Sequence, residues 1–167
     1  MAKRCDNKSV GVIIRRSDTF AVIKRKNFPV SYAFVAGHCD GDTYEDAAIK
    51  ETLEEVGIRV HTHKKMLAGS YKNPCKRDGG DGHHWQIFEA IGWDGELRAG
   101  SDAKEAFWVS LEELKRLQYR TEEVAKKLGV LVGDFQATER IVNDPDWQEE
   151  PGLEPIWVVM LQELGIL

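Results

Sequence analysis

Short apolar runs separated by turn residues dominate the first two thirds of the chain. The runs 10–15 and 20–25 flank a Ser17-Asp18 turn and predict an opening β-hairpin. Apolar and alternating patterns predict further strands at 32–36, 59–63, 65–71, 84–91 and 107–111. Strands mixed with a few helices favour an α/β sandwich around a mixed β-sheet.

The segment 43–57 has the spacing of a two-faced helix. On a helical projection, one side carries apolar or small residues and the other side carries acids. Thr43, followed three residues later by Asp46, predicts the start of this helix, and Gly57 predicts its end. The predicted apolar side comprises Ala48, Ile49, Thr52, Leu53 and Val56, and the acidic side Glu51, Glu54 and Glu55.

Helical patterns reappear near the C-terminus. Ser110 and Glu113 predict a capped helix through Leu117, and further helices are predicted at 121–128 and 155–164. The stretch 143–155 holds three of the five prolines and predicts a turn-rich linker. Because a tail of about 45 residues rarely forms its own core, we expect a domain at 1–120 with a helical extension at 121–167 packed on it.

Three acids crowd within one turn of the 43–57 helix. Like charges at these spacings repel by about 0.2–0.5 kcal/mol per pair, and a divalent cation would remove that repulsion. Mg²⁺ prefers oxygen ligands and shares its coordination with substrate phosphates. A solvated charged face is the alternative interpretation. The glycine-containing turn from Gly37 to Asp42 favours a metal site that holds a diphosphate.

This segment resembles the Nudix box, G-x5-E-x7-R-E-U-x-E-E-x-G-U, where U is aliphatic. The second half matches in register at Glu51, Glu54, Glu55, Gly57 and Ile58, and Gly37 is the equivalent of the leading glycine. The first half differs, because the loop is one residue shorter, Asp42 replaces glutamate, Lys50 replaces arginine and Thr52 replaces an aliphatic residue. The shorter Lys50–Asp42 pair lacks the bidentate fork of arginine.

The resemblance implies a Nudix-like α/β/α sandwich and a Mg²⁺-dependent hydrolase, with Mn²⁺ as a second usable ion. It implies metal ligation by Glu51, Glu54 and Glu55, with the main-chain carbonyl of Gly37 as an extra ligand. One more carboxylate should deprotonate the attacking water, and Glu51 or Glu105 is expected in that role. An exposed loop acid is the alternative interpretation of Glu105.

Substrate contacts are expected from cationic and aromatic side chains. Cations in and near the glycine-rich loop 72–82 are expected to bind the phosphates of the substrate. Aromatic rings are expected to stack on its base, although aromatic residues in strands more often belong to the core. Pro74 lies at a spacing from Ile58 similar to that in ADP-ribose-cleaving members, whereas His83 and His84 are expected at the surface. The candidate binding residues are Lys50, Lys76, Arg77, Phe28, Tyr32 and Trp85.

Composition narrows the class of protein. The 167 residues are 42% hydrophobic and 31% charged, which is typical of one globular domain. A net charge of −5 argues against a broad nucleic-acid-binding surface. Because no long apolar run and no signal-peptide pattern is seen, we expect no membrane segment and a cytoplasmic location.

Three cysteines, Cys5, Cys39 and Cys75, are odd in number and widely spaced, which favours free thiols. A zinc site that combines Cys39 or Cys75 with His38, His83 or His84 is an open alternative without paired ligand spacing.

The expected function is a hydrolase that cleaves the diphosphate linkage of a nucleoside diphosphate attached to another moiety. One competitor is a non-catalytic nucleotide-binding protein of the same fold, favoured by the altered loop. A second is an isomerase of isopentenyl diphosphate type, which needs an active-site cysteine. The expected partner is a small nucleotide substrate, and a homodimer is an expectation from the family.

Overall fold

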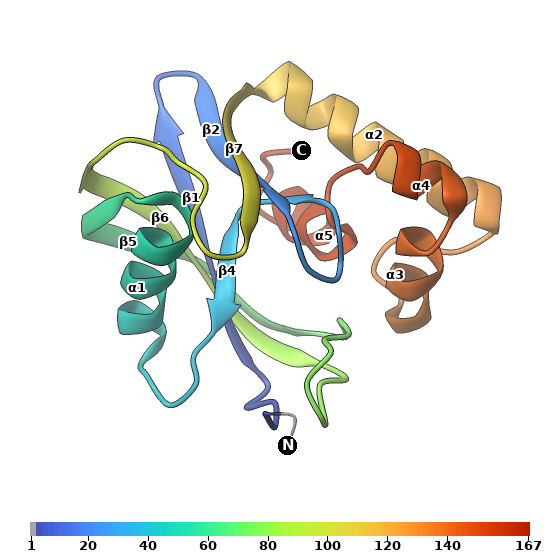
Figure 1. Ribbon diagram of the computed structural model, residues 1–167, viewed down its shortest axis with the longest axis horizontal. Coiled ribbons are helices and arrows are strands. Elements are labelled where there is room, and N and C mark those ends of the chain that lie inside the picture. Colours follow the sequence, from blue (N-terminus) through green and yellow to red (C-terminus); the bar gives the residue numbers. More distant parts are fainter. Residues whose placement is uncertain (1–2) are drawn as a thin grey trace.

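The computed structural model describes residues 3–167. Within this range the chain forms seven strands and five helices (Figure 1). In chain order they are β1 (Lys8–Arg16), β2 (Thr19–Arg25), β3 (Tyr32–Ala33), β4 (Val35–His38), α1 (Tyr44–Val56), β5 (Arg59–Tyr71), β6 (His83–Asp94), β7 (Ala103–Ser110), α2 (Leu111–Leu128), α3 (Phe135–Val142), α4 (Pro145–Glu149) and α5 (Pro155–Glu163).

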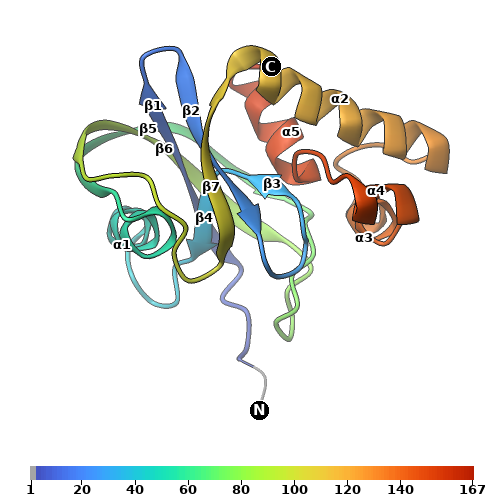
Figure 2. The ribbon, with the colours of Figure 1, turned by 45° about the horizontal axis from the view of Figure 1, so that its top comes forward.

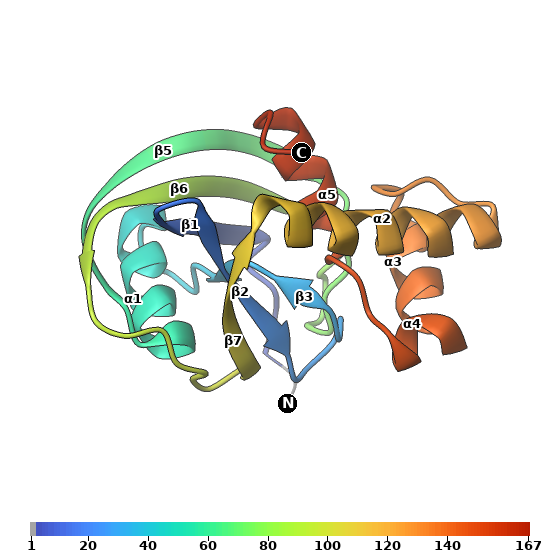
Figure 3. The same ribbon diagram turned by 90° about the horizontal axis from the view of Figure 1, so that it is seen from above.

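The strands form one mixed sheet with β1 at its centre. β1 pairs in parallel with β6 and antiparallel with β2 and β4, while β5 extends the sheet beyond β6. β3 and β7 both pair with β2. Helix α1 covers one face of the sheet, and α2 and α5 lie on the other face (Figures 2 and 3). The predicted α/β sandwich around a mixed sheet is therefore confirmed.

Strand β1 is buried on both faces, as its apolar run predicts for a central strand between helical layers. Val12, Ile13 and Ile14, which alternate between the two faces, are each at most 1% exposed. Gly11 interrupts this run because a Cβ at that position would lie 2.4 Å from Cη2 of Trp157, which belongs to α5. Trp157 is fully buried, so α5 is part of the main core.

Three strand predictions need correction. The predicted strand 32–36 is divided into β3 and β4. The predicted pieces 59–63 and 65–71 form one strand, β5, because register shifts absorb the breaks in the pattern while pairing with β6 continues. β7 begins at Ala103, several residues before the predicted start. Glu105 is consequently not a loop residue, since it pairs in register with Lys24 on β2.

The helical tail also differs from the prediction. The two helices predicted around 110–117 and 121–128 are one helix, α2, so position 120/121 lies inside it. Thr121 does not interrupt this helix because its hydroxyl donates to the Leu153 carbonyl at 2.6 Å. Helix α3 was not predicted, and the linker 143–155 contains α4.

A small second cluster explains these extra helices. Trp147 of α4 is 1% exposed and packs with apolar residues of α2 and α3, and its Nε1 donates to the Val30 carbonyl at 2.8 Å. Among residues 3–167, no helix is long and apolar enough to cross a lipid bilayer.

Replacing Gly11 with alanine should destabilise the protein by about 1–3 kcal/mol, because the added methyl group overlaps the ring of Trp157. Urea unfolding of Gly11→Ala, Trp157→Phe and the double variant measures this. The smaller ring should relieve the overlap, so the double variant should lose less stability than the two single losses combined. Additive losses would contradict this packing.

Candidate active site

The local sequence determines both ends of α1. Thr43 Oγ1 accepts a hydrogen bond from the Asp46 N–H at 3.1 Å, which caps the first turn. Gly57 ends the helix in the left-handed conformation at φ 71°. Both predicted ends are confirmed, and the helix packs against β1, β4 and β5.

The predicted faces of α1 are partly wrong. Leu53 was expected on the buried side but is 42% exposed, whereas Glu55 was expected among the exposed acids and is only 5% exposed. Glu55 turns inward because its Oε2 accepts a hydrogen bond from the Ala36 N–H of β4 at 3.2 Å. A carboxylate held by a backbone donor is thus buried at a position that the helical periodicity assigns to the exposed side.

Glu51 packs directly on the backbone of β4. A Cβ at Gly37 would lie 2.1 Å from Cδ of Glu51, so this close approach requires a residue without a side chain. Glu51, Glu55 and Gly37 all line one cleft, which the β2–β3 and β5–β6 loops also border. Glu54 is exposed and lies outside this lining.

Burial makes ionisation of the two cleft glutamates costly. Desolvation raises the pKa of Glu55 to about 8, although Arg25 and the Ala36 N–H partly oppose this effect. Desolvation, followed by the nearby Glu54 carboxylate, raises the pKa of Glu51 to about 7. A divalent cation would favour the ionised form of both groups. A pair of carboxylates fits Mg²⁺, which keeps several waters and takes further ligands from substrate phosphates.

Other parts of the fold complete the cleft. The lining also includes Ser9, Arg25, Phe28, Pro29, Ala36, His38, Asn73, Pro74, Cys75, Arg77, His83, Trp85, Asp102 and Glu154. Sequence reasoning missed Arg25 and its partner Glu154. Their side chains form an ion pair at 3.2 Å that connects the end of β2 to the residue before α5. It also missed Asp102, although the segment 101–105 was singled out as a source of an acid.

Several predicted site residues lie elsewhere. Lys50 pairs with Asp42 at 3.6 Å on the exposed side of α1. Tyr32 packs on Phe107 with ring centroids 6.1 Å apart. Lys50, Tyr32, Lys76 and Glu105 are described by the structure but are not among the residues that line the cleft.

Of the remaining predicted binding residues, Phe28, Trp85 and Arg77 line the cleft. Trp85 is buried, and its Nε1 donates to Asn73 Oδ1 at 3.0 Å, so it is chiefly a core residue. Phe28 is half-buried and carries the Lys76 ammonium 5.4 Å from its ring centroid.

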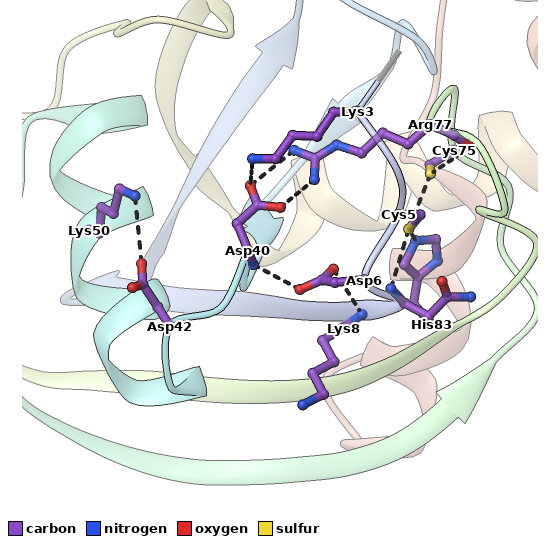
Figure 4. A network of polar contacts seen from close by, with 11 residues as sticks. Lys3, Cys5, Asp6, Lys8, Asp40, Asp42, Lys50, Cys75, Arg77 and His83 are labelled. Carbon is purple, nitrogen blue, oxygen red and sulfur yellow. Dashed lines mark hydrogen bonds and ion pairs between the residues drawn. The ribbon is translucent and has the colours of Figure 1, made fainter. Parts of the chain in front are cut away.

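Arg77 joins the loop 72–82 to the turn after β4. Its guanidinium makes a bidentate ion pair with Asp40, which Lys3 also contacts at 2.7 Å (Figure 4). The Arg77 guanidinium, together with the Lys3 ammonium, holds the pKa of Asp40 well below its usual range. In this arrangement Arg77 positions the loop rather than offering a free cation to the cleft.

The histidine prediction is half right. His84 is exposed, with its Nδ1 3.0 Å from the Tyr44 hydroxyl, but His83 is only 3% exposed. His83 is buried because its Nδ1 lies 3.2 Å from both the carbonyl and the side-chain oxygen of Asn73.

Comparisons with known proteins agree with this geometry. A family model described as NUDIX domain matches residues 6–128. The ADP-ribose pyrophosphatase of Methanocaldococcus jannaschii is 37% identical over 124 residues, which cover 71% of this chain and 70% of that protein.

Solved structures share the fold. A MutT NUDIX hydrolase from Burkholderia pseudomallei superposes with a TM-score of 0.53 and 24% identity, covering 64% of this chain and 84% of that one. The NUDIX domain of Shewanella oneidensis NrtR, complexed with ADP ribose, superposes with a TM-score of 0.54 and 12% identity. The match covers 77% of this chain and 90% of that one. Because the family model spans residues 6–128 and the Methanocaldococcus jannaschii relative is 37% identical, the chain belongs to the NUDIX hydrolase family.

Proposed function

We propose that this protein is a Mg²⁺-dependent hydrolase that cleaves the diphosphate linkage of a nucleoside diphosphate attached to another moiety. ADP-ribose is the first substrate to test, because the Methanocaldococcus jannaschii relative is an ADP-ribose pyrophosphatase. The observation that carries the proposal is the pair of inward-facing carboxyl groups, Glu51 and Glu55, packed against β4 at the cleft.

In this proposal Glu51 and Glu55 hold the cation, and the Gly37 carbonyl is a further ligand. A bound Mg²⁺ would neutralise phosphate charge and make water a better nucleophile. Glu54, on the exposed side of the same turn, acts through its charge on Glu51. The Ala36 N–H fixes the carboxylate of Glu55 in its place.

The general base is assigned to Asp102 rather than Glu105. Asp102 lines the cleft, and its charge adds a small contribution to the desolvation that raises the pKa of both Glu51 and Glu55. Asn27 Nδ2 donates to Asp102 Oδ1 at 3.2 Å and orients the carboxylate. Both acids are exposed, but Glu105, on β7, is not part of the lining. For the base of the nucleotide, Phe28 is the better platform because Trp85 is already buried.

Replacing Glu51 or Glu55 with glutamine should lower kcat for ADP-ribose hydrolysis in Mg²⁺ by at least about 100-fold, because each change removes a charged ligand. AMP release measured by chromatography tests this. Glu45→Gln, on the exposed first turn of the same helix, is the matched control and should keep normal turnover. Normal turnover in the Glu51 and Glu55 variants would refute the proposal, as would ADP-ribose binding without hydrolysis by the wild-type protein.

Replacing Gly37 with alanine should displace the Glu51 carboxyl group and reduce kcat at least about 10-fold while the protein still folds. The same assay measures the loss of kcat, and a thermal melt shows whether the variant still folds. Gly92→Ala is the control, since its methyl group would lie 3.3 Å from Thr62 Oγ1 and away from the cleft. Equal activity of both variants would mean that Glu51 does not need this close packing.

Asp102→Asn should reduce kcat by on the order of 10²-fold or more and flatten its dependence on pH, because the water loses its proton acceptor. Glu105→Gln should leave kcat within about twofold of the wild type. Rate–pH profiles of the two variants under saturating substrate distinguish the acids. The opposite pattern would return the role to Glu105.

A further inference from the structure

Four potential metal ligands, three of which line the cleft, converge without any role in the proposed hydrolysis. They are Cys5, His38, Cys75 and His83, and one ligand atom from each lies within 4.8 Å of all the others. They come from the segment before β1, the end of β4, the loop 72–82 and the first residue of β6. The fold therefore brings together residues that are 33, 37 and 8 positions apart along the chain.

The spacing of these atoms suits a tetrahedral ion. Cys5 Sγ lies 3.7 Å from Cys75 Sγ and 3.1 Å from His83 Nε2, as the dashed contacts in Figure 4 show. Ligand atoms around a tetrahedral Zn²⁺ with two sulfurs and two nitrogens lie about 3.4–3.8 Å apart. The imidazole rings of His38 and His83 meet edge to face with centroids 5.2 Å apart, so both rings border the same small volume.

The histidine nitrogens are arranged as metal ligands require. His38 Nε2 is one of the buried side-chain atoms that have no hydrogen-bond partner within the described part of the chain. The Asn73 oxygens face His83 Nδ1, which assigns the proton to Nδ1 and leaves the lone pair of Nε2 directed at the sulfur of Cys5. Such a hydrogen bond to the far nitrogen commonly orients a metal-binding histidine.

The thiols are supported in a similar way. The Asn7 N–H lies 3.4 Å from Cys5 Sγ, as a donor to a thiolate would. The loop also closes tightly around the second sulfur, because a Cβ at Gly80 would lie 2.1 Å from Cys75 Sγ. Both cysteines are free in the structure.

We propose that Cys5, His38, Cys75 and His83 bind a structural Zn²⁺ ion. Two cysteines and two histidines form a closed tetrahedral set without an open position, which is typical of structural rather than catalytic zinc. Thiolate and imidazole ligands select zinc over Mg²⁺, so this site is chemically separate from the carboxylates of the cleft. The proposal does not depend on which substrate the enzyme cleaves.

Zinc at this site would join the segment before β1 to three segments that line the cleft, namely the end of β4, the loop 72–82 and the start of β6. Cys5 N–H already donates to the Asp78 carbonyl at 2.9 Å, and Arg77 pairs with Asp40. The ion would add a link from both the N-terminal segment and the loop 72–82 to His38, which directly follows Gly37. Metal binding at this position holds the loop that carries Pro74 and Arg77 against the active site.

Metal content of the purified protein tests the proposal directly. Full-length protein produced with added zinc, and purified under reducing conditions without chelators, should contain about one zinc ion per chain by mass spectrometry of the metal. Cys75→Ser and His83→Gln should lose most of it. The matched controls Cys39→Ser, at a buried cysteine outside the cluster, and His84→Gln, next to His83, should retain it.

Two further measurements apply to the wild-type protein even where a variant does not fold. Replacement of zinc with Co²⁺ should give the visible bands of a tetrahedral ion and a thiolate charge-transfer band. Modification of the thiols should release zinc to a chromogenic chelator, and loss of zinc should lower the Tm. These readouts need no substrate, so they stay separate from the test of hydrolysis.

Three results would overturn the assignment. The first is zinc-free wild-type protein that gives no thiolate band with Co²⁺. The second is full zinc retention by Cys75→Ser. The third is a Cys5–Cys75 disulfide formed in place of metal in the zinc-supplemented, reduced protein, which would make the pair a redox element instead.

Discussion

The site depends on the packing of two glutamate side chains against the backbone of one short strand. Glu51 lies over Gly37, where no side chain has room, and Glu55 accepts a hydrogen bond from the neighbouring Ala36 N–H. Burying two carboxyl groups raises the free energy of their charged forms, so their pKa values rise. A cation bound in this space, as proposed above, would offset that cost and would link the fold of α1 and β4 to metal-dependent chemistry.

The rest of the architecture keeps that packing in place. β1 pairs with β4 on one side and β6 on the other, so the strand under the glutamates is held against the central strand of the sheet. Trp157 of α5 fills the space above Gly11 on β1, and the Arg25–Glu154 pair connects β2 to the residue before α5. The helical tail therefore contributes both to the core and to the cleft.

Local signals in the sequence were sufficient for some of these features and not for others. Thr43 and Gly57 act within one turn, so both ends of α1 could be predicted. Periodicity placed Leu53 inside and Glu55 outside, and it failed because a backbone donor on β4 decides the orientation of Glu55. Partners distant in the chain, such as Arg25 with Glu154 or Cys5 with His83, leave no local pattern. Helix α3 was missed although its buried residues Ala137, Thr138, Ile141 and Val142 recur at helical spacing.

The proposed magnesium and zinc sites use adjacent residues of β4, Gly37 and His38, and they use different ligand chemistry for different purposes. A crystal of the protein soaked in Mn²⁺, with anomalous data collected at the manganese edge, tests the central claim most directly. The account predicts anomalous density between the carboxyl groups of Glu51 and Glu55, beside the Gly37 carbonyl. Manganese bound only elsewhere, with both carboxyl groups unchanged, would contradict it.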